Sequence, residues 1–317
     1  MKCIRFSLLI KLVSLSISLV AQSSSPPPNP NAIALLRWYN ANTTTRFPSG
    51  DPAPAGIAFD GQNMWVAGYS TNTVAKIRCS DGELLGRFKV GKSPDGVAFD
   101  GANVWVTNNA GATISKLRAS DGALLGTFHV GGVPTYAAFD GQSIWVALEG
   151  EGSLRKLRPS DGAVLLTVSV GGDPVNLAFD GSNVWASLGN GDAVAKVRAT
   201  DGKVLGTFPV GNNAQGIAFD GSNIWVANTT SGNVMELSAT DGAILGTFQT
   251  GGIGPAGLVF DGTNIWVTNV DSLTVTKLRA ADGANLGSFP VPGQPSATAF
   301  DGANVWVVLS SGYVAKM

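Results

Sequence analysis

The chain has 317 residues, of which 44% are hydrophobic and 14% charged, and its formal net charge is -1. This composition excludes an intrinsically disordered protein and a coiled coil, and the near-neutral charge without a basic patch gives no electrostatic support for nucleic-acid binding. The 41 glycines follow no three-residue period, which excludes collagen. The single histidine, His129, restricts the catalytic chemistry that the chain can perform.

Residues 1–22 are predicted to be a secretory signal peptide. Lys2 and Arg5 precede an apolar stretch at 6–20, and small residues that suit a signal peptidase follow it. At 15 residues this stretch is short for a membrane span, and an uncleaved amino-terminal anchor is the alternative. Later apolar runs are too short to cross a bilayer. We therefore expect an extracytoplasmic protein, secreted or periplasmic, with no membrane span after signal removal.

Residues 23–42 are predicted to form a Pro/Ser-rich spacer and a short amino-terminal segment. The stretch SSSPPPNP at 23–30 has nothing to bury and predicts a stiff, extended linker. Residues 32–39 are expected to form a short helix, with a further strand as the alternative. After signal removal Cys79 is the only cysteine, so the exported chain has no intramolecular disulfide and must be stabilised by its core.

An internal repeat determines the predicted fold. Phe-Asp-Gly recurs at spacings of 40 or 41 residues, a tryptophan follows each phenylalanine by six positions, and a second Asp-Gly lies midway through each period but the last. The phenylalanine and tryptophan pairs are Phe59/Trp65, Phe99/Trp105, Phe139/Trp145, Phe179/Trp185, Phe219/Trp225, Phe260/Trp266 and Phe300/Trp306.

Each period contains four short β-type segments, which in the second unit are residues 96–99, 103–107, 113–118 and 123–130. Asp-Gly between apolar runs predicts a hairpin with a primed turn, because glycine accepts positive φ. The inner segments are apolar on both faces, so the sheets must be covered on both sides. The sequence therefore predicts an all-β protein, a seven-bladed β-propeller of four-stranded antiparallel blades over residues 43–317.

The last unit ends inside its third strand, and the segment 43–50 is predicted to supply the missing outer strand. Phe47 precedes Gly50 by three positions, as Phe128 precedes Gly131. This amino-terminal strand would complete the last blade and close the ring, which would remove the exposed sheet edge. We expect a monomer.

The repeated side chains are predicted to be structural. The Asp of Phe-Asp-Gly caps its own turn, with a metal-binding ring as the alternative, and each tryptophan fills the space between blades, with a carbohydrate-stacking ring as the alternative. Lys-x-Arg pairs on the third strands are expected to cover the blade edges and to pair with nearby Asp residues, with a basic ring for an anionic partner as the alternative. The fifth blade departs from this pattern with Glu236 and Ser238.

The loops divide the propeller into two faces. The Asp-Gly turns are nearly identical from unit to unit and must share one face, whereas the loops on the opposite face vary and can form an asymmetric pocket. On the variable face, the positions that begin the innermost strands should surround the channel mouth, and Tyr136 and Asn176 follow where most other units have Gly. The predicted ligand-binding residues are Asp95, Thr135, Tyr136, Asn176, Gln215 and Asn228.

Four acidic residues in the variable loops, Glu149, Glu151, Asp173 and Asp192, form a candidate metal site. Oxygen ligands of this kind suit Ca²⁺, so the predicted cofactor is either none or Ca²⁺, and a merely solvated rim is the alternative to the metal site.

The repeat pattern Phe-Asp-Gly-x-Asn-x-Trp-Val, with Lys-Leu-Arg-x-Ser-Asp-Gly and Thr-Phe-x-Val-Gly, resembles bacterial YVTN-type propellers and the propellers grouped with virginiamycin B lyase. The resemblance covers roughly residues 43–317 and implies the propeller fold. It also implies a lyase that opens a lactone with metal-assisted histidine and glutamate chemistry, which His129 alone, on an outermost strand, does not supply. Lactonase and phosphotriesterase propellers instead bind calcium with Glu, Asn and Asp at the central channel.

The sequence leaves three functions open, because fold does not determine function. The favoured one is an exported, non-enzymatic binding or scaffold protein whose variable face binds a protein, a glycan or a small ligand. The alternative is a Ca²⁺-dependent lactonase- or lyase-like enzyme at the channel mouth. The third is an envelope structural module with no small-molecule site.

Overall fold

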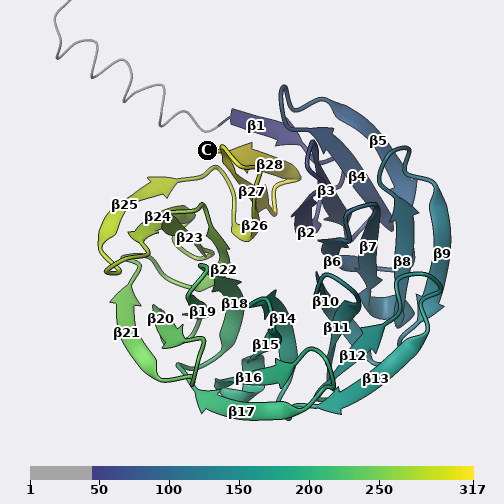
Figure 1. Ribbon diagram of the computed structural model, residues 1–317. Helices are drawn as coiled ribbons and strands as arrows, with labels where there is room; N and C mark the ends of the chain where they lie inside the picture. The colour runs from purple at the N-terminus through teal and green to yellow at the C-terminus, as the bar shows by residue number, and fades with distance from the viewer. Residues whose placement is uncertain (1–44) are drawn as a thin grey trace, which may run out of the picture. The chain divides into compact units, whose positions relative to one another are not determined.

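The computed structural model describes residues 45–317, which form 28 β-strands in seven four-stranded sheets. The sheets are arranged as blades around a central axis, with the first strand of each blade innermost (Figure 1). The predicted seven-bladed propeller is therefore confirmed. The predicted signal peptide, the proline-rich spacer and the segment 32–39 lie outside the described residues.

The strands of the first four blades, from the axis outward, are as follows. Blade one is β2 (Pro54–Phe59), β3 (Asn63–Gly68), β4 (Thr73–Arg78) and β5 (Leu84–Lys89), and blade two is β6 (Pro94–Phe99), β7 (Asn103–Asn108), β8 (Thr113–Arg118) and β9 (Leu124–His129). Blade three is β10 (Val133–Phe139), β11 (Ile144–Glu149), β12 (Ser153–Leu157) and β13 (Val164–Ser169), and blade four is β14 (Pro174–Phe179), β15 (Asn183–Leu188), β16 (Ala193–Arg198) and β17 (Val204–Pro209).

The remaining blades repeat this order. Blade five is β18 (Ala214–Phe219), β19 (Asn223–Asn228), β20 (Asn233–Ser238) and β21 (Ile244–Gln249), and blade six is β22 (Pro255–Phe260), β23 (Asn264–Asn269), β24 (Thr274–Arg279) and β25 (Asn285–Pro290). Blade seven is β26 (Pro295–Phe300), β27 (Val305–Leu309), β28 (Tyr313–Lys316) and β1 (Thr45–Pro48). Two 3-10 turns, η1 (Asn109–Gly111) and η2 (Gly189–Gly191), follow β7 and β15. Within the described range, no helix is long and apolar enough to cross a membrane.

The Asp-Gly turns contain the predicted positive φ at glycine. In blade one Phe59 pairs with Met64, the Asp60 N–H donates to the Asn63 carbonyl at 3.0 Å, and Gly61 has φ +96°. The Asp60 carboxylate accepts hydrogen bonds from the backbone N–H groups of Gln62 and Asn63, so it caps its own turn as predicted.

The aspartate and the tryptophan of each repeat form one hydrogen-bonded unit. In blade four Asp180 Oδ1 accepts the N–H groups of Ser182 and Asn183 at 2.9 and 2.7 Å, and Asp180 Oδ2 accepts the Trp185 indole N–H at 2.8 Å. All seven blades contain the bond between aspartate and indole, at 2.7–2.8 Å. The Trp185 ring packs against Ile217 of the next blade. The predicted structural roles of both residues are confirmed.

The repeated lysines also bind the next blade, which was not predicted. The Lys76 ammonium group donates to the Ala119 carbonyl of the next blade at 2.6 Å and lies 5.3 Å from the centre of the Trp65 ring. The lysine side chain is buried between blades, where a backbone carbonyl is within reach.

The predicted pairing with neighbouring aspartates is found for Arg78 and for one lysine. Arg78 pairs with Asp81 at 2.9 Å, and the Lys156 ammonium group lies 3.6 Å from Asp140 Oδ2.

The first and last blades are joined by contacts from both ends of the described chain. Strand β1 is antiparallel to β28, with Phe47 opposite Val314, and the Phe47 ring stacks on Trp306 at 5.5 Å. The same stacking occurs within blade five, between Phe248 and Trp225 at 5.3 Å. A Cβ on Gly82 of blade one would lie 1.9 Å from the Phe47 ring, so the glycine permits this close approach.

Candidate functional site

A cavity of about 500 Å³ lies on the propeller axis. It is lined by residues at the beginning of the innermost strands, which is the end opposite the Asp-Gly turns, so it belongs to the face of the variable loops. The structure places all seven predicted channel-mouth positions in this lining: Ala55, Asp95, Thr135, Val175, Gln215, Ala256 and Ser296.

Glycine follows these positions in several blades because the inner strands approach one another closely. A Cβ on Gly96 would lie 2.6 Å from the Thr135 carbonyl oxygen, and one on Gly216 would lie 2.0 Å from that of Ala256. Blades three and four have Tyr136 and Asn176 at this position instead, and both line the cavity. The repeat therefore builds a symmetric ring, and these two departures give the cavity an asymmetric wall.

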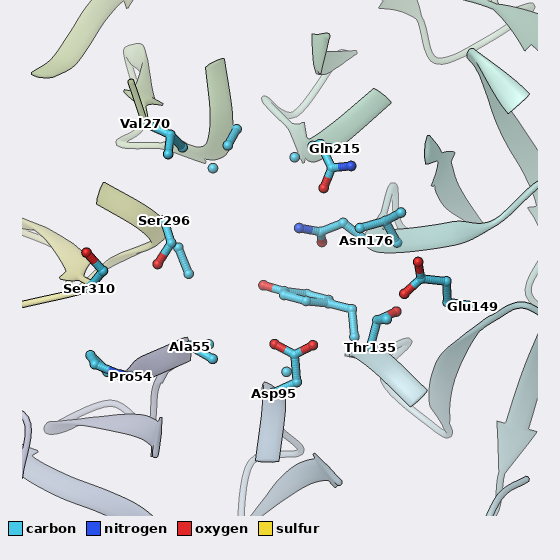
Figure 2. Close-up of a pocket in the computed structure, with 18 residues that line it drawn as sticks. Pro54, Ala55, Asp95, Thr135, Glu149, Asn176, Gln215, Val270, Ser296 and Ser310 are labelled. Atoms are coloured by element: carbon cyan, nitrogen blue, oxygen red, sulfur yellow. The ribbon is translucent and has the colours of Figure 1, made fainter. Parts of the chain in front are cut away.

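The polar side chains gather on one side of the cavity. Asp95, Asn176 and Gln215 point into it, whereas small or apolar residues line the opposite wall (Figure 2). Asn176 Oδ1 accepts the Leu177 N–H at 2.8 Å, and Gln215 Nε2 donates to Asn213 at 2.6 Å. Within the described chain, the Asn176 side-chain N–H groups and the Gln215 side-chain oxygen, Oε1, make no hydrogen bond, whereas the Gln215 backbone carbonyl accepts the Ser187 hydroxyl. One donor group and one acceptor therefore face the cavity.

Asp95 is the most perturbed carboxyl of the site. It is largely buried, and among residues 45–317 its carboxylate has no hydrogen-bond or ion-pair partner. Burial, and then the negative charge of Glu149, raise the pKa of Asp95 to about 6. Burial and the charge of Asp95 also raise the pKa of the Tyr136 phenol. Near pH 6, Asp95 can therefore give or take a proton, whereas Tyr136 remains a neutral hydroxyl.

The Asp95→Asn substitution should stabilise the protein at neutral pH. The pKa of Asp95 is raised, so the folded state retains the proton between about pH 4 and 6 while the unfolded state loses it, and the free energy of unfolding falls as pH rises through this window. We expect Asp95→Asn to gain about 1–3 kcal/mol at pH 7.5 in urea unfolding, and the gain to shrink as pH approaches 4.

Asp192→Asn is the matched control, because Asp192 lies outside the cavity lining and has a positive φ that asparagine tolerates. Asp192→Asn should not be more stable than the wild type at pH 7.5, because asparagine retains the acceptor for the Asn213 N–H. A loss of stability in Asp95→Asn at pH 7.5 would contradict the conclusion that the Asp95 carboxylate has no partner in the protein.

The structure separates two predicted site residues from the ligand-facing set. Asn228 is fully buried at the end of β19, where its Nδ2 donates to Asn233 Oδ1 at 2.8 Å, so it does not line the cavity. Thr135 lines the cavity, but its hydroxyl donates to the Pro174 carbonyl at 3.3 Å.

The four acidic residues of the predicted Ca²⁺ site do not assemble into one. Glu151 pairs with Arg155 at 3.3 Å, Asp173 Oδ1 accepts the Gly150 N–H at 3.0 Å, and Asp192 Oδ1 accepts the Asn213 N–H at 2.8 Å. Within residues 45–317, no group of three or more His, Cys, Asp or Glu is placed to hold a metal ion. The predicted set is therefore corrected: backbone and side-chain donors already occupy three of its members, and the fourth, Glu149, lines the cavity.

Sequence reasoning missed that Glu149 acts on Asp95 rather than on the loop acids. Glu149 occupies the position directly after Leu148, and the corresponding residues of blades six and seven, Val270 and Ser310, also line the cavity. The sequence could have indicated this position as part of the cavity lining, because the variable loops begin there.

Comparison with known proteins finds solved structures of the same fold. No family model and no curated protein sequence matches the chain. Among solved structures, a catalytically inactive histidine-to-alanine variant of virginiamycin B lyase from Staphylococcus aureus, with quinupristin, is similar at a TM-score of 0.77 and 16% identity, covering 86% of this chain and 98% of that one. A streptogramin B lyase is similar at a TM-score of 0.75 and 18% identity, covering 86% of this chain and 96% of that one. Kuenenia stuttgartiensis hydrazine synthase is similar at a TM-score of 0.74 and 17% identity, covering 86% of this chain and 98% of that one.

The likeness is one of fold. The predicted resemblance to virginiamycin B lyase-like seven-bladed propellers is confirmed at that level. In this chain the sole histidine, His129, is exposed at the end of the outer strand β9 and does not line the cavity. The similar structures therefore show the fold of this chain, and its activity depends on the residues of the cavity.

Proposed function

We propose that the protein is an exported binding module whose central cavity, on the face of the variable loops, holds a small polar ligand. The observation that carries this proposal is the asymmetric lining of the cavity, in which Asp95, Asn176 and Gln215 present unpartnered polar groups on one side. A volume of about 500 Å³ falls within the range of about 300–1,000 Å³ that is typical of small-molecule sites.

The difference between side chains that recur in every blade and those that depart from the repeat supports this proposal. Side chains that build the blades recur in nearly every unit and satisfy one another, as Asp180 and Trp185 do. Tyr136 and Asn176 break the repeat at a cavity-lining position where most other blades have glycine, and they contribute a hydroxyl and an amide there. Polar groups that have no partner within the protein and line an open cavity are available to a ligand.

The test is a calorimetric screen of neutral sugars, polyols and small ammonium compounds. Gln215→Ala should weaken the bound ligand roughly 10-fold, the value of one hydrogen bond of about 1–1.5 kcal/mol. Gln62→Ala is the matched control, because Gln62 lies in a turn on the opposite face. A ligand whose affinity is the same in Gln215→Ala and in the wild type, or is reduced by Gln62→Ala, would contradict the assignment.

The raised pKa of Asp95 favours a second candidate, a lyase- or lactonase-like enzyme at the same cavity. A carboxyl with a pKa of about 6 beside a second carboxylate is suited to general acid–base catalysis. Under this alternative a lactone would be opened with Asp95 moving the proton. Asp95→Asn would then abolish turnover of a lactone that the variant still binds, whereas a binding module gives no turnover in either protein.

A further inference from the structure

The cavity contains negative charge without compensating positive charge. Asp95 and Glu149 both line it, and among the described residues no lysine, arginine or histidine does. Neither carboxylate has an ion-pair partner within residues 45–317, and Asp95 points into the open space (Figure 2). The charge of Glu149 makes ionisation of Asp95 less favourable unless a cation lies between or beside the two carboxylates.

Asp95 differs in this respect from carboxylates elsewhere in the propeller. The Asp180 carboxylate accepts hydrogen bonds from four donor groups, and Asp161 in an exposed turn pairs with Arg158 at 2.9 Å. Asp51, which is buried, accepts hydrogen bonds from Ala53 and Thr71. The fold therefore satisfies these carboxylates and leaves the one in the cavity available to a ligand.

We propose that the cavity binds a ligand through a positively charged organic ammonium group, held by Asp95 and Glu149. This inference rests on the proposed function and narrows it to one chemical class. The positive charge of an ammonium group compensates the carboxylates in a partly desolvated site. A primary ammonium group also donates charge-assisted hydrogen bonds, which are stronger than neutral ones, whereas a quaternary ammonium group acts through its charge alone. The Tyr136 phenol lines the same space and adds an aromatic surface, which attracts cations.

The remaining polar groups fix the rest of the ligand. The Asn176 amide donates and the Gln215 carbonyl accepts, so a hydroxyl or amide on the ligand is satisfied on the same side of the cavity. The opposite wall contains Val270 and Ala297, which suit a hydrocarbon portion, together with the hydroxyl groups of Ser296 and Ser310. A short chain with an ammonium group and a hydroxyl matches this arrangement.

The proposal implies a defined pH dependence. The titratable groups that face the cavity are Asp95, Glu149 and Tyr136, and the pKa of Asp95 is about 6 in the free protein. A bound cation favours the ionised carboxylate, so binding releases a proton near pH 6. Affinity should therefore be constant above about pH 7 and should fall by up to about 10-fold per pH unit below 6.

The experiment is isothermal titration of the full chain with choline, ethanolamine and 1,5-diaminopentane, and with 3,3-dimethyl-1-butanol as the neutral isostere of choline. We expect at least one ammonium compound to bind, the neutral isostere to bind at least 10-fold more weakly, and Asp95→Asn to weaken the ammonium ligand roughly 10- to 100-fold. Asp192→Asn, whose side chain lies outside the cavity, should bind as the wild type does.

The outcomes separate this inference from the proposed function. Neutral sugars or polyols that bind in a Gln215-dependent manner, without binding of any ammonium compound, would overturn the ammonium site and leave the binding module intact. Equal binding of choline and its neutral isostere, or Asp95-dependent binding of Ca²⁺ alone, would also overturn it. Absence of binding by every compound in both panels would overturn the inference and the proposed function together.

Discussion

A chain that starts at Ser49 should unfold at least about 4 kcal/mol more easily than a chain that starts at Thr45. The shorter chain loses β1, its hydrogen bonds to β28 and the Phe47 ring that stacks on Trp306. Deletion of a fully buried phenylalanine side chain costs about 3–5 kcal/mol, so the half-buried Phe47 contributes less than this, and the lost hydrogen bonds to β28 contribute the rest. The freed edge of β28 also becomes available for pairing with other molecules. Urea unfolding and light scattering measure both effects.

Two glycine substitutions provide a matched control for the closure. Gly82 and Gly61 both have positive φ, so alanine strains the backbone at each position. Only at Gly82 would the new Cβ lie 1.9 Å from the Phe47 ring, while at Gly61 nothing lies within 4 Å. Gly82→Ala should therefore cost more than Gly61→Ala. Equal costs, or equal stability of the two truncated chains, would contradict a ring closed by β1.

Asp180→Ala should cost about 3–5 kcal/mol of unfolding free energy, because it leaves the buried Trp185 indole N–H and two turn N–H groups without their acceptor. Burial raises the pKa of Asp180, but hydrogen bonds from Trp185, Asn183 and Ser182 outweigh burial and lower the pKa below its usual value. The stabilisation is therefore present above the ordinary aspartate pKa and is lost as pH falls through the lower, folded-state value. Chemical denaturation at pH 7 and at pH 3 measures it.

The control for this prediction is the other repeated aspartate. Asp161 lies in an exposed turn of blade three and pairs with Arg158 on the surface. Asp161→Ala should change the unfolding midpoint only slightly, because exposed ion pairs contribute little. A comparable loss in Asp161→Ala and Asp180→Ala would mean that the indole hydrogen bond does not distinguish the two turns.

The repeat made the architecture predictable because each repeated residue has a local partner. The Asp and Trp of one unit lie five residues apart, and their hydrogen bond forms within a single hairpin. The lysine partner was not predictable in this way. Lys76 reaches the carbonyl of Ala119 in the next blade, and a sequence period does not show which atoms of neighbouring units come within reach.

The candidate site was predictable only in part. The ring of first positions follows from the topology, so Asp95 and Gln215 were placed in the lining correctly. The effect of Glu149 on the pKa of Asp95 was missed. Asp95 lies on the first strand of blade two and Glu149 on the second strand of blade three, so the repeat does not show that they are near each other. Asn228 was misplaced because the end of a second strand was read as an exposed loop, whereas its side chain is buried.

A crystal structure of the protein with the best ligand from the titrations is the most direct test that the axial cavity is the binding site. We expect density for the ligand between Asp95, Asn176 and Gln215, with a polar atom of the ligand within hydrogen-bond distance of at least one of them. Density on the Asp-Gly face or on the outer rim, with the axial cavity filled by solvent alone, would contradict the account.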